Sequence, residues 1–341
     1  MSMRPSPLWF AGIAAAVALA SPSRGQDQPA PAPAQPPAPA AAAPLDQAQA
    51  ETLGYRPDWT ERMTVPVGIG EAGPYRFVVD TGAERTVISR ELASELALSP
   101  GRAVAVHSMT EVSRIQTVIL PGLRIGQRTV NGIEAPALSR VNLGASGLLG
   151  VDSLQQQRVV FDFQREEMTI TPSRRAERQW PAGSIVVTGR RLFGRLVLVD
   201  AQVDGERVWV IIDTGSQVSV ANSALRDRLQ RRRRLGILHP IQLTSITGGT
   251  IDAEYGVARL IRIGGIDITD LPIAFADVHP FRQLRLTDRP ALLLGMDALR
   301  LFDRVSVDFA NRRVRVLLPD SSEQMPETRM AATQRAARIA S

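Results

Sequence analysis

A six-residue stretch occurs twice in this sequence, at residues 78–83 (VVDTGA) and again at residues 211–216 (IIDTGS), and it limits the folds that the chain can adopt. In each copy a carboxylate follows a run of β-branched residues, where a buried strand is expected to end and a turn to begin. The Thr that comes next can hydrogen-bond sideways, and the Gly permits a backbone turn that a Cβ would obstruct. Two such turns predict two like sites whose carboxylates, Asp80 and Asp213, can meet as one pair.

The surroundings of this motif are duplicated as well. The segment 148–152 (LLGVD) returns as 293–297 (LLGMD), and the segment 159–163 returns as 305–309. Asp213 follows Asp80 by 133 positions, whereas Gly295 follows Gly150 by 145 positions. Matching segments in unchanged order, separated by small insertions, indicate an internal duplication.

The N-terminus has the three-part pattern of a secretory signal peptide, because Arg4 precedes an apolar run that ends near Ala20. The alternative is that this run stays uncleaved as a membrane anchor. A Pro- and Ala-rich spacer that cannot bury a core follows it. The predicted division is a signal peptide (1–20), a spacer (21–58), an N-terminal lobe (59–172), an inter-lobe linker (173–184), a C-terminal lobe (185–319) and a polar tail (320–341).

Composition excludes several classes of function. All 40 basic residues are Arg and the formal net charge is +6, but the Arg residues are scattered among 34 acids and only 5% of residues are aromatic. Nucleic-acid binding is therefore not expected. The chain has no Cys, which removes disulfides and thiol chemistry, and His107, His239 and His279 lack the spacing of a zinc site. We predict no metal and no cofactor, and an exported chain without Cys indicates a bacterial periplasmic or secreted protein.

On the two Asp-Thr-Gly motifs and the two apolar-apolar-Gly segments, the sequence resembles the aspartic peptidases of the pepsin-like and retropepsin-like branches. It is most similar to the periplasmic retropepsin-related peptidases of Gram-negative bacteria. The resemblance implies an all-β fold with two tandem retropepsin-like (acid protease) β-barrel lobes, related by a pseudo-two-fold axis, with the active site at the lobe interface. It also implies that Asp80 and Asp213 form the catalytic dyad.

The resemblance further implies roles for the neighbouring residues. The Thr hydroxyls would brace the two turns, the Gly residues would let a substrate backbone approach, and the hydroxyl of Ser216 would hydrogen-bond the neighbouring carboxylate. The apolar-apolar-Gly segments would form the second strand of each active-site ψ-loop and support the turns by packing. The residues concerned are Thr81, Gly82, Thr214, Gly215 and Ser216 around the dyad, and Leu149, Gly150, Leu294 and Gly295 in the ψ-loops.

Local patterns predict several elements. Ser89 is expected to cap a helix, and a second helix is expected to start at Asn222. Asp204-Gly205 is expected to form a hairpin turn, and residues 115–125 are expected to form one strand.

Two further features follow from pattern. Asp152 and Asp297 come just after a Gly and before an expected helix, so N-capping is the favoured role for both. A hairpin flap is expected over the cleft in each half, at 106–114 and at 244–252. Neither tip carries the Tyr of pepsin, which favours the retropepsin branch, but Val151 and Met296 stand where that branch places an Arg, so substrate pockets cannot be transferred.

Two carboxylates that share a proton supply a base and an acid, which is enough to activate water against an amide without a covalent intermediate. We therefore predict a monomeric, secreted or periplasmic aspartic endopeptidase that acts on a peptide or protein in the cell envelope. One alternative is a non-catalytic peptide- or protein-binding module on the same fold. Another is a homodimeric enzyme in which like lobes pair between chains. The run 231–234 (RRRR) is expected to be the solvated end of a helix, the alternative being contact with anionic lipid or an acidic partner.

Overall fold

The computed structural model describes residues 50–58, 61–154, 156–174, 184–192, 195–198, 201–318 and 329–331. All of them belong to the compact unit Ala48–Ser341, which is distinct from the unit Met1–Gln47. The predicted signal peptide, most of the spacer, the middle of the inter-lobe linker and most of the tail therefore lie outside the described residues. Within those ranges no helix is long and apolar enough to cross a membrane.

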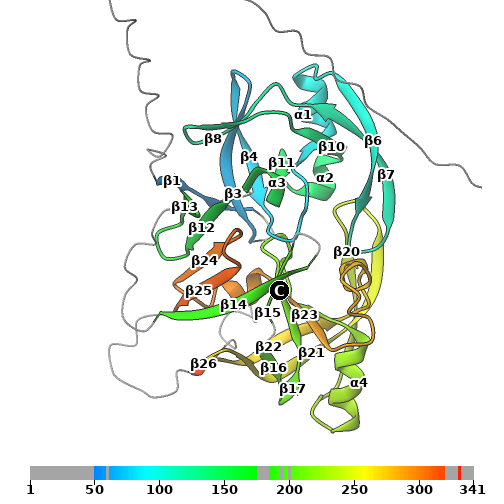
Figure 1. Ribbon diagram of the computed structural model, residues 1–341. Helices are drawn as coiled ribbons and strands as arrows, with labels where there is room; N and C mark the ends of the chain where they lie inside the picture. The colour runs from blue at the N-terminus through cyan, green and yellow to red at the C-terminus, as the bar shows by residue number, and fades with distance from the viewer. Residues whose placement is uncertain are drawn as a thin grey trace, which may run out of the picture. The chain divides into compact units, whose positions relative to one another are not determined.

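The first half of the fold is built from short strands and short helices (Figure 1). Its helix α1 begins where the sequence predicts, because the Ser89 side chain caps it by accepting a hydrogen bond from the backbone N–H of Leu92. In chain order the elements are β1 (Glu51–Gly54), β2 (Arg56–Pro57), β3 (Met63–Ile69), β4 (Ala72–Val79), β5 (Val87–Ser89), α1 (Arg90–Glu95), β6 (Pro100–His107), β7 (Val112–Ile119), β8 (Leu123–Ile125), β9 (Arg128–Val130), β10 (Glu134–Leu138), α2 (Arg140–Leu143), β11 (Gly147–Leu149), α3 (Val151–Leu154), β12 (Gln157–Asp162) and β13 (Glu167–Pro172).

The second half repeats much of this order. The predicted Asp204-Gly205 turn joins two antiparallel strands, and Asn222 caps α4 by accepting a hydrogen bond from the N–H of Leu225. The elements are β14 (Ile185–Leu192), β15 (Arg195–Leu198), β16 (Ala201–Val203), β17 (Glu206–Arg207), β18 (Trp209–Ile212), β19 (Val220–Ala221), α4 (Ser223–Arg231), β20 (His239–Thr244), β21 (Thr250–Ile263), β22 (Ile266–Phe275), α5 (His279–Gln283), β23 (Ala291–Leu294), α6 (Met296–Leu299), β24 (Arg304–Asp308), β25 (Arg313–Leu317) and β26 (Arg329–Ala331).

Each Asp-Thr-Gly motif follows a strand, β4 or β18, that pairs with an apolar strand enclosed by the same pattern of neighbours. β11 pairs in parallel with β4 and antiparallel with β5. In the second half, β23 pairs in parallel with β18 and antiparallel with β19. A strand that is buried on both faces has a continuous apolar sequence. This explains the unbroken apolar residues at the end of β4 and β18, which precede the motifs, and in β11 and β23, which pair with them.

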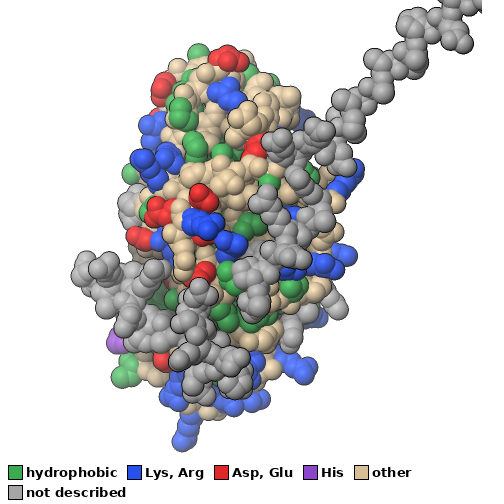
Figure 2. Space-filling model, turned by 90° about the vertical axis from the view of Figure 1, so that its left-hand side faces the viewer, with side chains coloured by type: hydrophobic (Ala, Val, Ile, Leu, Met, Phe, Trp, Pro, Cys, Tyr) green, Lys and Arg blue, Asp and Glu red, His purple; other side chains and the backbone are tan. Residues whose placement is uncertain are grey.

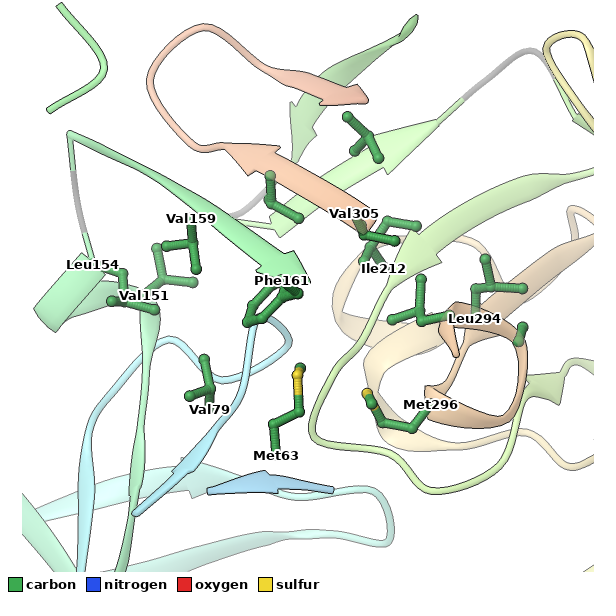
Figure 3. Packing of buried hydrophobic residues seen from close by; sticks show 14 of the residues in the cluster. Met63, Val79, Val151, Leu154, Val159, Phe161, Ile212, Leu294, Met296 and Val305 are labelled. Atoms are coloured by element: carbon green, nitrogen blue, oxygen red, sulfur yellow. The ribbon is translucent and has the colours of Figure 1, made fainter. Parts of the chain in front are cut away.

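The two halves share one sheet and one core. β12 of the first half pairs antiparallel with β24 of the second, which continues the order β1-β13-β12-β24-β25-β14 across the junction. Figure 3 shows Val79 and Phe161 packed in the same cluster as Ile212, Leu294 and Val305. Two tandem β-rich domains are therefore joined through apolar packing as well as through the chain. A pseudo-two-fold axis between them stays a prediction.

The fold departs from the sequence-based expectations at three places. The predicted spacer does not extend to residue 58, because β1 pairs with β13 and Tyr55 is buried with its ring edge-on to Phe163. The stretch 115–125, expected as one strand, is divided between β7 and β8, since Pro121 between them has no N–H to donate. Within the predicted tail, β26 pairs in parallel with β22.

Candidate active site

Each Asp-Thr-Gly motif is fixed to its neighbouring strand at the point where the turn begins. The backbone N–H of Asp80 donates to the carbonyl of Leu149 over 3.0 Å, and that of Asp213 donates to the carbonyl of Leu294 over 3.1 Å. The strands β11 and β23, which carry the ψ-loop residues, therefore lie directly behind the turns. Gly150 follows β11 and packs so closely on the backbone of Arg85 that a Cβ would collide with it.

The two motifs are joined by a reciprocal network of hydrogen bonds between their Thr residues. The hydroxyl of Thr81 donates to the carbonyl of Ile212 over 3.0 Å, and that of Thr214 donates to the carbonyl of Val79 over 2.7 Å. Each hydroxyl also accepts from the other motif, Thr214 Oγ1 from the N–H of Thr81 at 3.0 Å and Thr81 Oγ1 from the N–H of Thr214 at 3.2 Å. Both Thr side chains are buried. The network holds the two turns in one relative position.

The carboxylates of the two motifs face the same space. Oδ1 of Asp80 accepts from the N–H groups of Gly82 and Ala83, at 2.8 and 2.9 Å, and Oδ1 of Asp213 accepts from the N–H of Gly215 at 3.0 Å. A Cβ on Gly82 would lie 2.6 Å from Oδ1 of Asp213, and a Cβ on Gly215 would overlap the carboxyl group of Asp80. Each Gly thus lies against the other motif's carboxylate, which is why a side chain is excluded there.

Ser216 corrects one of the sequence-based expectations. Its hydroxyl does not serve the neighbouring carboxylate but donates to the carbonyl of Val218 over 2.7 Å. The chain bends back after Gly215, which brings the Val218 carbonyl within reach, while the backbone N–H of Gly215 already bonds the Asp213 carboxylate. Ser216 therefore stabilises the loop that follows the motif.

The prediction that Asp152 and Asp297 are helix caps is wrong. Each carboxylate instead accepts hydrogen bonds from the loop that follows a motif, and we call this arrangement a clamp. Asp152 accepts from the N–H and the hydroxyl of Thr86, at 2.9 and 2.7 Å. Asp297 accepts from the N–H and the hydroxyl of Ser219, at 2.8 and 2.7 Å, and the N-cap position of α6 is Gly295. The signal was present in the sequence, since a hydroxyl residue stands six positions after each motif Asp.

A cleft of about 970 Å³ opens in front of the two motifs and is lined by both Asp80 and Asp213. Its floor and walls come from both halves, and Glu61 and Arg300, which form an ion pair between the halves, stand among its lining. The second half contributes an apolar wall made of Val218, Ile241, Leu243, Leu271, Pro272 and Met296. A concave, largely apolar site with a few polar groups at its base is suited to an organic ligand.

Two β-hairpins line the cleft, as predicted, and their tips meet. The hairpin β6–β7 and the hairpin β20–β21 lie on the same side of the molecule (Figure 1), and Thr247 Oγ1 donates to Ser108 Oγ over 3.2 Å. Met109 at the first tip packs against an apolar cluster of the second half, and Ile246 at the second tip packs against a cluster of the first half. The tips therefore cross over, a long-range arrangement that sequence patterns do not reveal.

The three His residues do not form a metal centre. His107 and His279 are neighbours, with Nδ1 and Nε2 3.2 Å apart, while His239 begins β20. Across the part of the chain that the structure describes, no group of three or more His, Asp or Glu side chains is arranged to hold a metal ion.

Asp297, the clamp residue of the second half, has a raised pKa. Burial raises the pKa of Asp297 to about 6, against the opposing effect of its hydrogen bonds from Ser219 and Ala298. Burial, and then the nearby Asp297 charge, raise the pKa of Tyr255. Because the folded-state pKa of Asp297 lies above its ordinary value of 3.8, its contribution to stability is fully present below about pH 4 and is lost as the pH rises through about 6.

Asp297→Asn is therefore expected to remove this pH dependence. Between about pH 4 and pH 7 the unfolding free energy of the unmodified protein should fall relative to that of the variant, by at most about 3 kcal/mol. Urea denaturation of both proteins at a series of pH values measures the difference. A difference that stays constant with pH would show that Asp297 titrates alike in the folded and unfolded chains.

Removing one bracing hydroxyl should destabilise the protein strongly. Thr81→Val leaves the N–H of Thr214 and the carbonyl of Ile212 without their partner, and each buried orphan group costs roughly 1–3 kcal/mol. We expect a loss of about 2–4 kcal/mol of unfolding free energy, measured by chemical denaturation. Thr81→Ser keeps the hydroxyl and should lose far less, so equal losses in the two variants would argue against the hydrogen bonds as the cause.

Comparison with known proteins gives an independent result. The family model described as "gag-polyprotein putative aspartyl protease" matches residues 65–156, and the family model described as "Aspartyl protease" matches residues 199–298. The first match contains Asp80 and the second contains Asp213. No curated protein matches the sequence at a significant level. The chain therefore carries two aspartyl protease domains of the retropepsin-like type in tandem.

Proposed function

We propose that this protein is an aspartic endopeptidase in which Asp80 and Asp213 of one chain form the catalytic dyad. The observation that carries the proposal is the reciprocal bonding of Thr81 and Thr214, which holds both carboxylates at the base of one cleft. The two aspartyl protease domains make peptide-bond hydrolysis the expected activity. Retention of an Asp in each motif favours catalysis over binding alone.

The proposed reaction needs no group beyond the dyad and water. Two carboxylates so placed cannot both ionise easily, and they share one proton. The ionised member takes a proton from water, whose oxygen attacks the amide carbonyl carbon, while the protonated member donates to the carbonyl oxygen. When the carbon–nitrogen bond breaks, the leaving nitrogen takes a proton from one member of the dyad, while a hydroxyl of the tetrahedral intermediate gives its proton to the other as the carbonyl re-forms. The two roles belong to the pair, because coupled groups titrate together.

The proposed substrate is a polypeptide in extended form. The cleft is lined by two hairpins whose tips touch, so a chain must thread beneath them or the tips must part. Met296, Leu243 and their apolar neighbours on the second half favour large apolar side chains on that side of the cleft. On the strength of the predicted signal peptide, we propose that the enzyme is periplasmic or secreted and cuts proteins of the cell envelope.

Digestion of a denatured protein across about pH 3 to 8 tests the activity. Products identified by mass spectrometry should show internal cleavage, and they should be absent when either motif Asp is replaced by Asn. If the unmodified protein produces no new peptides from a broad mixture of denatured substrates, yet retains peptides on gel filtration, the non-catalytic binding module is the better description.

A further inference from the structure

We propose that the end of α4 and the loop that follows it, residues 228–238, form a docking surface for an anionic phospholipid membrane. We call this segment the basic tip. It lies at the lower end of the second half in Figure 1, and Figure 2 shows Arg side chains gathered at the same lower end of the molecule. The proposal does not depend on the peptidase activity, because it concerns a surface outside the cleft.

The basic tip is longer and more basic than the matching connection of the first half. From Asp80 to the first residue of β6 is 20 positions, whereas from Asp213 to the first residue of β20 is 26. The extra residues lengthen the helix and the loop, so that α4 has 9 residues where α1 has 6. In the first half the same connection reads ELALS (95–99), which has no basic residue. The basic tip is therefore not a feature that the two halves share.

Only some of the Arg residues of the basic tip form ion pairs within the described part of the protein. Arg232 and Arg234 pair with the buried Glu206, at 2.7 and 3.9 Å. Arg228, Arg231 and Arg233 are exposed, and within the described ranges no ion pair involves any of the three. Three guanidinium groups therefore project from one end of the molecule. They can contact phosphate groups without breaking an existing ion pair, and guanidinium suits phosphate geometrically.

An apolar side chain stands beside this charge. Ile237 is 82% exposed, more than any other large hydrophobic side chain of the described residues. Its neighbours Leu235 and Leu238 pack against the core, so they anchor the loop while Ile237 points outward. A protein gains nothing in water from holding Ile in that position, but an apolar residue flanked by cations is the pattern by which surface segments enter the boundary between lipid headgroups and acyl chains.

This combination favours a membrane over an acidic protein as the partner. Attraction to an acidic protein would need only the Arg residues, whereas a bilayer offers an anionic surface for the Arg residues and an apolar layer for Ile237. The predicted export of the chain would bring it to a bilayer surface. The occupant we propose is therefore a membrane rich in anionic phospholipid.

Vesicle sedimentation of the full chain tests the proposal. Vesicles of phosphatidylcholine with about 30% phosphatidylglycerol are compared with vesicles of phosphatidylcholine alone. Arg231→Glu/Arg233→Glu should lower the partition coefficient on the anionic vesicles at least tenfold, and Ile237→Ser should lower it several-fold. The matched control is Arg312→Glu/Arg313→Glu, which makes the same change of charge at two exposed Arg residues near β25 and should lower binding less than threefold.

The N-terminal apolar segment is common to all variants, so the differences between them report on the basic tip. Equal losses in the control and the basic-tip variants would overturn the proposal in favour of attraction by overall charge. Equal binding of the unmodified protein to both kinds of vesicle, with no loss in the basic-tip variants, would also overturn it. If Ile237→Ser has no effect and soluble polyglutamate displaces the protein from vesicles, the surface serves an acidic protein instead. Cleavage of a soluble peptide should be unchanged in every variant, so this test can fail or succeed independently of the peptidase.

Discussion

Asp80→Asn and Asp213→Asn are each expected to lower kcat for peptide hydrolysis by about 10⁴-fold, because either change removes the shared proton pair on which both the acid and the base steps depend. Asn keeps the shape of Asp and an oxygen for the N–H groups that bond Oδ1 of each carboxylate. The turns should therefore remain intact. Steady-state kinetics on a fluorogenic peptide, with circular dichroism to verify folding, provides the measurement.

The matched control is Asp288→Asn, which replaces an exposed carboxylate outside the cleft lining and should leave kcat unchanged. A large loss in only one of the two dyad variants would contradict the shared-proton mechanism. It would favour a single catalytic carboxylate assisted by some other group. A folded variant that retains a tenth or more of the original kcat would exclude its Asp from the dyad.

Gly215→Ala is expected to lower kcat by at least about 100-fold, since the new methyl group would displace the carboxyl group of Asp80, and misplacement of a reacting group by about 1 Å costs that much. Gly82→Ala places its methyl group 2.6 Å from Oδ1 of Asp213 and should act on the other member of the pair. The two variants thus report on opposite carboxylates through the same kind of contact.

The control for these variants is Gly265→Ala in the turn between β21 and β22, where a Cβ meets nothing within 4 Å. It should change neither kcat nor the melting temperature appreciably. Melting temperatures are needed for all three variants, because a protein that unfolds loses activity for a trivial reason. Full activity in a folded Gly215→Ala protein would show that Gly215 does not lie against the Asp80 carboxyl group.

Features of this protein that depend on a few adjacent residues could be predicted from the sequence. The strand endings at Asp80 and Asp213, the caps Ser89 and Asn222, and the Asp204-Gly205 turn each depend on a few adjacent residues. The pairing of the two motifs could be inferred from the duplication. That inference depends only on the repeated sequence and does not require knowing how the chain folds.

The features that sequence reasoning missed depend on contacts between distant segments. Asp297 clamps Ser219, 78 positions away in the sequence, and only the packed fold brings them together. The crossing of the hairpin tips through Met109 and Ile246 has the same origin. Ser216 was misassigned because the sequence does not reveal the bend of the loop that brings the Val218 carbonyl to its hydroxyl.

Mixing the two dyad variants tests whether Asp80 and Asp213 of the same chain form one dyad. If Asp80 and Asp213 of the same chain form the dyad, every molecule in an equimolar mixture of Asp80→Asn and Asp213→Asn lacks one carboxylate. The mixture should then stay as inactive as its components at any concentration, while the unmodified protein cleaves the peptide. Recovery of a substantial fraction of that activity on mixing, rising with protein concentration, would contradict the account and show that Asp80 of one chain meets Asp213 of another. Activity that either variant retains alone would instead show that like lobes pair between chains.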